Sequence, residues 1–232
     1  MTNQTPDSVP DINDWNLLLE GKVVVISGGG SGIGRSISEL FAAHGAVVEI
    51  AEIDAGIAEA AVDGITNAGG KVRAHIVDVC DEDNVADFRK DVLEMHGHID
   101  VLVNNVGDYR PLVRFLDSSP ASWKEMYDIN LHHVFLVTHA FLQSMVDHGG
   151  GAIINIHSVE GMRGYLGDPV YGAMKAAVAH FSTCLAAEFG RKGIRVNGMG
   201  VDLTQTSQVD YISGYEDVDH LWEAWAPVGR LG

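Results

Sequence analysis

Short apolar runs alternate with amphipathic stretches along most of this chain, and this alternation constrains the fold more than any other feature. The apolar runs are nearly continuous and rich in Val and Ile, which is typical of strands buried on both faces. They lie at 22–27, 47–51, 72–77, 101–104, 152–156 and 194–199. The stretches with helical spacing lie at 33–44, 55–68, 83–96, 122–146 and 170–191. Because strands that alternate with helices form parallel sheets, we predict a doubly wound α/β fold with helices on both faces.

Length and composition favour one domain without nucleic-acid or membrane contacts. The 232 residues are 46% hydrophobic, which is enough for one large core, and no Pro/Ser-rich linker interrupts them. We expect a single domain over 21–232 after a flexible lead over 1–20. A formal net charge of -17 would repel a polyanion, so we expect no nucleic-acid partner. No apolar segment is long enough to span a membrane, and 1–20 is too polar and acidic for a secretory signal.

The cysteines and histidines give no sign of a metal site. Cys80 and Cys184 are far apart and have no metal-ligand spacing around them, so we expect a reducing, cytoplasmic location. His132, His133 and His157 also lack partners at ligand spacing. We interpret these histidines as structural residues with satisfied side chains, of which His157 alone is close to a predicted site.

A glycine-rich segment directly follows the first predicted strand and opens the first predicted helix. It has the spacing Gly28-x-x-x-Gly32-x-Gly34, whereas the pattern G-x-G-x-x-G fits in no register. Glycines allow backbone N–H groups to approach a pyrophosphate, and a helix N-terminus favours negative charge. The position therefore predicts a dinucleotide site in a Rossmann-type sheet. The candidate cofactor contacts here are Ser27, Gly28, Gly30, Ser31, Gly32, Ile33 and Gly34.

An acidic residue, Glu52, stands at the end of the second predicted strand. A carboxylate there can accept hydrogen bonds from the adenosine ribose hydroxyls and repels a 2′-phosphate, which favours NAD over NADP. The neighbouring Ser31 and Ile53 are not basic, in agreement with that preference. Asp54 is a competing candidate two residues later, and a merely solvated acid is the alternative interpretation.

A second group of candidate residues follows the fifth predicted strand. Ser158 stands just after that strand, and Tyr171 and Lys175 lie one helical turn apart at the start of the next long helix. A phenol next to an ammonium should have a lowered pKa, so Tyr171 can act as a general acid or base while Ser158 binds the substrate oxygen. The spacing Tyr-x-x-x-Lys is common on helix surfaces, but its combination with this serine and the glycine segment indicates catalysis.

Together these motifs resemble the short-chain dehydrogenase/reductase family over about residues 21–231. Residues 27–34 are similar to its Thr-Gly-x-x-x-Gly-x-Gly loop, with Ser27 in place of Thr. Residues 104–107 are similar to its Asn-Asn-Ala-Gly element, with Val106 in place of Ala. Asn130, in the sequence Tyr-Asp-Ile-Asn-Leu, matches the family's fourth catalytic position.

The resemblance implies roles that the residues alone do not give. It implies a catalytic tetrad of Asn130, Ser158, Tyr171 and Lys175, in which Asn130 holds a water of the lysine proton relay. It also implies that Lys175 binds the nicotinamide ribose and that Thr206 binds the carboxamide. The other cofactor contacts that it implies are Ile53, Asp78, Val79, Asn105, Val106, Gly107 and Thr204.

Two departures from the family pattern lie near the C-terminus. The family's Pro-Gly after the sixth strand is replaced by Val201-Asp202, which we expect to reshape that turn. Residues 226–232 resemble the stretch before the family's last helix and strand, so we expect that last strand to be missing here. We also expect a homodimer or homotetramer formed through the long helices 122–146 and 170–191, as the resemblance implies.

The leading hypothesis is an NAD-dependent oxidoreductase that transfers a hydride between nicotinamide and a secondary alcohol or ketone. An alternative is a sensor or scaffold that binds NAD without turnover, and a third possibility is epimerisation or dehydration through a transient ketone. The substrate is a small molecule whose identity the sequence leaves open. Arg110 and Arg163 lie in the predicted substrate loops, where they either bind an anionic group or are simply solvated.

Overall fold

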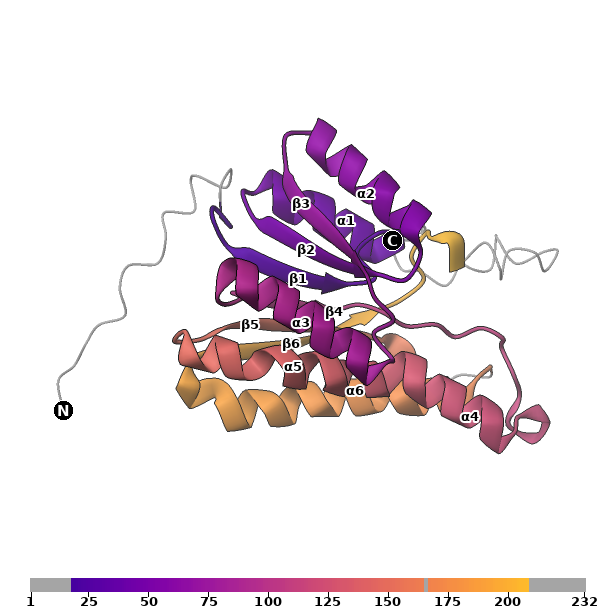
Figure 1. The fold of residues 1–232 in the computed structure, drawn as a ribbon. Helices are drawn as coiled ribbons and strands as arrows, with labels where there is room; N and C mark the ends of the chain where they lie inside the picture. The colour runs from indigo at the N-terminus through magenta and orange to yellow at the C-terminus, as the bar shows by residue number, and fades with distance from the viewer. Residues whose placement is uncertain (1–17, 165–166, 209–232) are drawn as a thin grey trace.

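The computed structural model describes residues 18–164 and 167–208, and these form one parallel sheet between two layers of helices (Figure 1). The sheet has six strands in the order β3-β2-β1-β4-β5-β6. The strands are β1 Val23–Ser27, β2 Val47–Glu52, β3 Lys71–Ile76, β4 Val101–Asn104, β5 Gly151–Ser158 and β6 Ile194–Val201. The helices are α1 Gly32–Ala43, α2 Ala55–Asn67, α3 Glu82–His96, α4 Pro120–Tyr127, α5 His133–Asp147 and α6 Pro169–Phe189. The doubly wound fold predicted from the sequence is confirmed.

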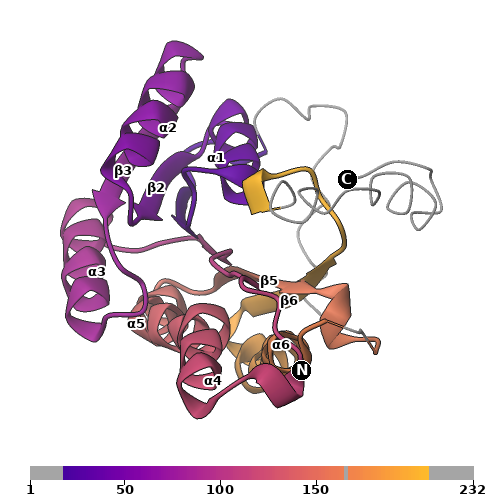
Figure 2. The ribbon, with the colours of Figure 1, turned by 90° about the vertical axis from the view of Figure 1, so that its right-hand side faces the viewer.

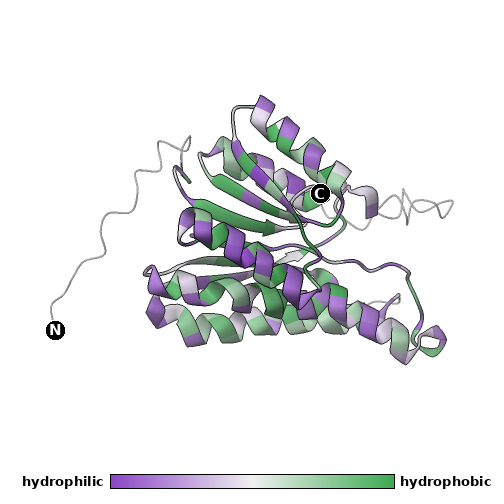
Figure 3. Ribbon diagram, in the orientation of Figure 1, coloured by the Kyte–Doolittle hydropathy of each residue, from purple (hydrophilic) through white to green (hydrophobic). Residues whose placement is uncertain are grey.

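The helices divide between the two faces of the sheet as right-handed crossovers require. On one face, Ala42 of α1 and Ile65 of α2 pack against β1 and β2. On the other face, Phe88 of α3, Phe141 of α5 and Leu185 of α6 share a core with the same strands and with β4 to β6. Figure 2 shows these two layers on opposite sides of the sheet. Figure 3 shows that the central strands β1 and β2 are hydrophobic over most of their length, as their burial on both faces demands.

Aspartates just before three helices fix where those helices begin. The side chains of Asp54, Asp81 and Asp168 accept hydrogen bonds from backbone N–H groups in the first turns of α2, α3 and α6. Asp168 is bonded to the N–H groups of Val170 and Tyr171, at 3.1 Å each. This cap fixes the first turn of α6, and with it the position of Tyr171 near the carboxyl ends of the strands.

The prediction of one continuous helix over 122–146 was wrong in its centre. The segment Asp128–His132 is a π-helical turn between α4 and α5. Its extra residue turns the side chain of Asn130 inward, where it is fully buried and hydrogen-bonded to the backbone of Asp108. Single π turns of this kind occur frequently at functional sites.

Some expectations fall at or beyond the limits of the described residues. The last part of the predicted flexible lead is a turn fixed to the rest of the fold, because Leu19 N donates to His44 O at 3.0 Å. Residues 1–17 and 209–232 lie outside the described residues, and with them the expectations about the lead and the last strand. None of the described helices has the length and apolar character needed to cross a membrane.

Candidate active site

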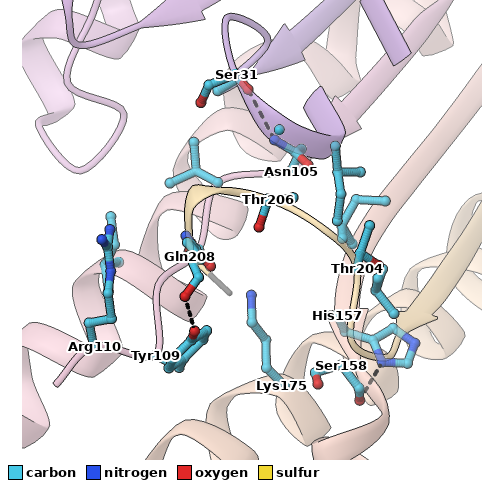
Figure 4. A pocket seen from close by; sticks show the side chains of 18 of the residues that line it. Ser31, Asn105, Tyr109, Arg110, His157, Ser158, Lys175, Thr204, Thr206 and Gln208 are labelled. Carbon is cyan, nitrogen blue, oxygen red and sulfur yellow. Dashed lines mark hydrogen bonds between the residues drawn. The ribbon is translucent and has the colours of Figure 1, made fainter. Parts of the chain in front are cut away.

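A cleft of about 470 Å³ opens at the carboxyl ends of the strands, where doubly wound sheets bind their ligands. The loops after β1, β2, β4 and β5 and the segment after β6 surround it (Figure 4). The residues with predicted roles that line it are Gly28, Ser31, Gly32, Ile33, Glu52, Ile53, Asp78, Val79, Asn105, Val106, Gly107, Ser158, Tyr171, Lys175, Thr204 and Thr206. Ser27, Gly30, Gly34 and Asn130 do not line the cleft.

The glycines of the first loop allow the N-terminus of α1 to approach β1 closely. A Cβ on Gly34 would lie 2.0 Å from the carbonyl oxygen of Gly28, which no real contact allows. Gly28 and Gly32 have φ values of 62° and 52°, which other residues rarely adopt. The loop therefore owes its shape, which suits a phosphate group, to Gly28, Gly32 and Gly34 in particular and not simply to the number of glycines in it.

We expect Gly34→Ala to lower the free energy of unfolding by about 1–3 kcal/mol, because the added methyl group overlaps backbone that cannot easily move. Gly190→Ala is the matched control, since a Cβ there meets nothing within 4 Å. Urea unfolding of both variants checks this expectation. Equal stability of Gly34→Ala and the wild type would mean that the loop is loosely packed.

Ser27 and Asn105 join the first and fourth strand ends beneath the cleft. Ser27 Oγ accepts hydrogen bonds from Asn105 N at 3.0 Å and from Val106 N at 3.3 Å. Asn105 Nδ2 donates to the carbonyl oxygens of Ser27 and Gly28, at 3.1 Å each. Ser27, predicted as a cofactor contact, is fully buried and instead braces the loops that form the cleft.

Glu52 lies at the end of β2 with its carboxylate fixed by backbone groups. Its Oε2 accepts from Gly30 N at 3.2 Å and its Oε1 accepts from Ile53 N at 3.0 Å. A Cβ on Gly30 would lie 2.7 Å from Oε2, so this glycine is needed for the approach of the carboxylate. The competing candidate Asp54 does not line the cleft and caps α2 through Ile57 N at 2.9 Å.

Ser158, Tyr171 and Lys175 line the same cleft, where Ser158 is hydrogen-bonded to Tyr171 and Lys175 lies over the Tyr171 ring. Burial raises the pKa of Tyr171 to about 12; a hydrogen bond with Ser158 acts in the opposite direction, and the carboxylates of Glu160 and Asp108 reinforce the rise. The expectation that Lys175 lowers this pKa was therefore wrong. Lys175 Nζ lies 5.6 Å from the centroid of the Tyr171 ring, over its face, and burial of the phenol outweighs the charge.

Lys175 is itself almost completely buried, with 4% of its surface exposed. Burial lowers the pKa of its amine to about 8, against a weaker attraction to Asp108 that raises it. The amine lies against Gly107, where a Cβ would come within 2.4 Å of Nζ. Any residue other than glycine at 107 would displace this amine from the cleft.

Asn130 holds the loop that carries Gly107 and Asp108. Its Oδ1 accepts from Asp108 N at 3.1 Å, and its Nδ2 donates to Asp108 O at 2.7 Å. These two bonds satisfy the buried amide and fix the loop after β4 beside Lys175. A role for Asn130 in holding a water stays a prediction.

Tyr109 carried no sequence signal, whereas Arg110 and Arg163 were candidates from the sequence. The ring of Tyr109 lies edge-on to that of Tyr171, with centroids 6.1 Å apart. The two arginines of the substrate loops are partly exposed and form ion pairs with nearby carboxylates: Arg110 with Asp108 at 2.7 Å, and Arg163 with Glu160 at 2.8 Å.

His133 is one of the histidines that we interpreted as structural residues. The side chain is fully buried, and hydrogen bonding between its ring and the backbone at Val106 and Ile129 favours the protonated form only weakly. Burial, with the nearby charge of Lys175, lowers the pKa of His133 to about 3, so the ring is neutral. Within residues 18–164 and 167–208, no group of three His, Cys, Asp or Glu side chains could hold a metal ion.

Comparisons with known proteins agree with this geometry. A family model described as short chain dehydrogenase matches residues 22–214, a range that includes the glycine loop, Glu52, Ser158, Tyr171 and Lys175. The 3-oxoacyl-acyl-carrier-protein reductase FabG of Chlamydia muridarum is 35% identical over 218 residues, which are 94% of this chain and 87% of the relative. The 7alpha-hydroxysteroid dehydrogenase of Escherichia coli K12 is 31% identical over 220 residues, or 95% of this chain and 85% of the relative.

Solved structures show the same likeness. A 7alpha-hydroxysteroid dehydrogenase complexed with NADH and 7-oxo glycochenodeoxycholic acid superposes with a TM-score of 0.89 at 30% identity. The superposition covers 95% of this chain and 85% of that structure. The matched regions therefore include most of both chains.

Proposed function

This chain belongs to the short-chain dehydrogenase/reductase family, and from that premise we propose that it is an NAD-dependent oxidoreductase acting on a secondary alcohol or ketone. One observation carries the proposal. Tyr171 is hydrogen-bonded to Ser158 and lies under the amine of Lys175, and these three residues line the same cleft as the glycine loop and Glu52. This arrangement supports a reacting carbon next to Tyr171 and a dinucleotide along the rest of the cleft.

The cleft has the form that a dinucleotide requires. A Cβ on Gly28 would approach Val106 Cγ2 to 3.0 Å, so the cradle exists only because this residue has no side chain. We propose that the N–H groups at the start of α1 bind the phosphates and that Glu52 binds the adenosine ribose. When bound there, NAD would supply the hydride acceptor and NADH the hydride donor.

The protein's own side chains would move the proton. With a pKa of about 12, Tyr171 carries its proton at neutral pH and can donate it from Oη to the oxygen of a ketone. Ser158 Oγ would hydrogen-bond the same oxygen. Lys175, whose pKa of about 8 lies near neutrality, can accept and release a proton behind Tyr171. In alcohol oxidation the same groups would act in the reverse order.

The relatives support this chemistry without identifying the substrate. One is named a reductase of a 3-oxoacyl group and another a dehydrogenase of a hydroxysteroid, and both names describe a carbonyl–carbinol pair. The solved complex with NADH supports our choice of NAD. We further propose a homodimer or homotetramer formed through α4, α5 and α6, and a cytoplasmic location for the domain 21–232.

The choice of NAD depends on Glu52, so we expect Glu52→Ala to weaken NADH binding and to reduce the preference for NADH over NADPH by about tenfold. Glu52→Gln separates two roles of this side chain. Its amide oxygen can still accept from Gly30 N, but the charge that would repel a 2′-phosphate is gone. Titrations followed by nicotinamide fluorescence measure both affinities for each variant.

Asp54→Asn is the matched control, because it removes a neighbouring charge and keeps a side chain that can cap α2. Its ratio of NADH to NADPH affinity should equal that of the wild type. An unchanged ratio in Glu52→Ala would contradict the ribose role of Glu52. Absence of binding of both cofactors to the wild type would contradict the proposed function itself.

A further inference from the structure

The segment 202–208, which we call the strap, leaves β6 and crosses to the opposite side of the cleft (Figure 4). Two hydrogen bonds attach its end there. Gln208 Nε2 donates to Gly107 O at 2.9 Å, and the hydroxyl of Tyr109 donates to the carbonyl oxygen of Gln208. We call these two bonds the clasp. The strap also touches the glycine loop, because a Cβ on Gly32 would lie 3.3 Å from Thr206 Cγ2.

Gly107 and Tyr109, to which the strap is hydrogen-bonded, each contact one member of the Tyr171–Lys175 pair. Gly107 is the residue against which the Lys175 amine lies, since a Cβ at 107 would come within 2.4 Å of Nζ. Tyr109 packs edge-on against the ring of Tyr171 at an interplanar angle of 77°. One short stretch of the loop after β4 therefore connects the strap to both groups that handle the proton.

We propose that Tyr109 and Gln208 are positioning residues, and that the clasp couples closure of the strap to the placement of Tyr171 and Lys175. The proposal rests on the proposed function of the cleft. Opening the strap breaks both bonds of the clasp, and the carbonyl of Gly107 and the hydroxyl of Tyr109 then each lose a partner that restrains them. The closed strap therefore adds to the bonds from Asn130 and Asp168 in holding the proton-transfer groups in place.

The electrostatics of Lys175 agree with this coupling. Its pKa is lowered to about 8 by burial, and the loop at 107–109 is part of the wall that buries it. Asp108, which the same loop carries, raises this pKa, and His133 faces the amine as a neutral group. Looser packing of the loop would admit water, and the pKa of Lys175 would rise toward its ordinary value.

The test uses Tyr109→Phe, which removes the hydroxyl and keeps the ring, and Gln208→Leu, which removes the donor to Gly107. Brief acetylation with acetic anhydride over a range of pH, read by peptide mass spectrometry, reports the reactivity of Lys175. Only the unprotonated amine reacts, so the inflection of the profile gives the pKa of Lys175. Tyr127→Phe is the matched control, because it removes a hydroxyl on α4 outside the clasp.

We expect the inflection for Lys175 to rise by roughly one pH unit in both clasp variants, and not in Tyr127→Phe. We also expect kcat for reduction of cyclohexanone by NADH to fall about fivefold in each variant, as loss of one hydrogen bond predicts. The double variant should fall little further, because either change opens the same clasp.

An unchanged Lys175 profile in both clasp variants would overturn the proposal, as would an equal shift in Tyr127→Phe. Because acetylation needs no turnover, these outcomes are independent of the proposed function. A wild-type protein that consumes no NADH with any ketone would contradict the proposed function, and the acetylation profile would still decide the coupling. Thermal unfolding of each variant verifies that a shift does not come from global destabilisation.

Discussion

Tyr171→Phe is expected to lower kcat by about a thousandfold while the affinity for NADH stays close to that of the wild type. The variant removes only the hydroxyl that would donate or accept the substrate proton, and general acid–base groups contribute factors of about 10²–10⁴. The phenyl ring keeps its packing against Tyr109, so the cleft should keep its shape. Steady-state rates with the best ketone or alcohol of the wild type, together with an NADH titration, measure the two quantities.

The control for this variant is again Tyr127→Phe, which should leave kcat unchanged. Retained turnover in Tyr171→Phe would refute the role of the phenol. A wild-type protein that binds NADH tightly and turns over no alcohol or ketone would favour the alternative of a sensor that binds without catalysis. The experiment therefore separates an error in the mechanism from an error in the function class.

Lys175→Met is expected to stabilise the fold while it abolishes turnover. Burial lowers the pKa of Lys175 from 10.5 to about 8, so keeping the amine charged inside the protein costs about 3 kcal/mol at neutral pH. The unfolded chain binds this proton up to pH 10.5 and the folded chain only up to about pH 8. The cost is therefore fully present below pH 8 and diminishes as the pH rises from 8 to 10.5.

Urea unfolding at pH 7 and at pH 10 checks this sign. We expect the methionine variant to exceed the wild type by up to about 3 kcal/mol at pH 7 and by clearly less at pH 10. Lys175→Arg keeps the charge and should show no gain at pH 7. Equal stability of wild type and Lys175→Met at pH 7 would mean that the buried ammonium is already well compensated.

The parts of the site that the sequence predicted are those fixed by local position. A parallel sheet brings the ends of its strands to one edge, so placing Gly28, Glu52 and Ser158 after three strands was enough to bring them to one cleft. Tyr171 and Lys175 needed only the period of one helix. The order of strands and helices followed for the same reason, since the alternation of apolar runs encodes the layers directly, whereas the break at Asp128–His132 did not.

The parts that the sequence did not predict depend on contacts between distant segments. Tyr109 and Gln208 are ordinary loop residues until the fold brings them together. The raised pKa of Tyr171 was missed because burial, which exceeds the effect of the nearby ammonium, is a property of packing. Ser27 was assigned to the cofactor for a related reason, because sequence cannot show whether a hydroxyl faces the cleft or the loop behind it.

The π turn at Asp128–His132 determines which sides of α4 and α5 face the rest of the protein. It inserts one residue beyond the α-helical repeat, which rotates everything that follows by about 100° around the axis. The apolar residues of the two helices are therefore out of phase along the sequence, and the π turn brings both sets to the same side, where Tyr127 of α4 and Val134 of α5 pack in one cluster. A single deletion in this turn would leave an unbroken helix with normal helical content, yet one whose two halves could not both face the protein.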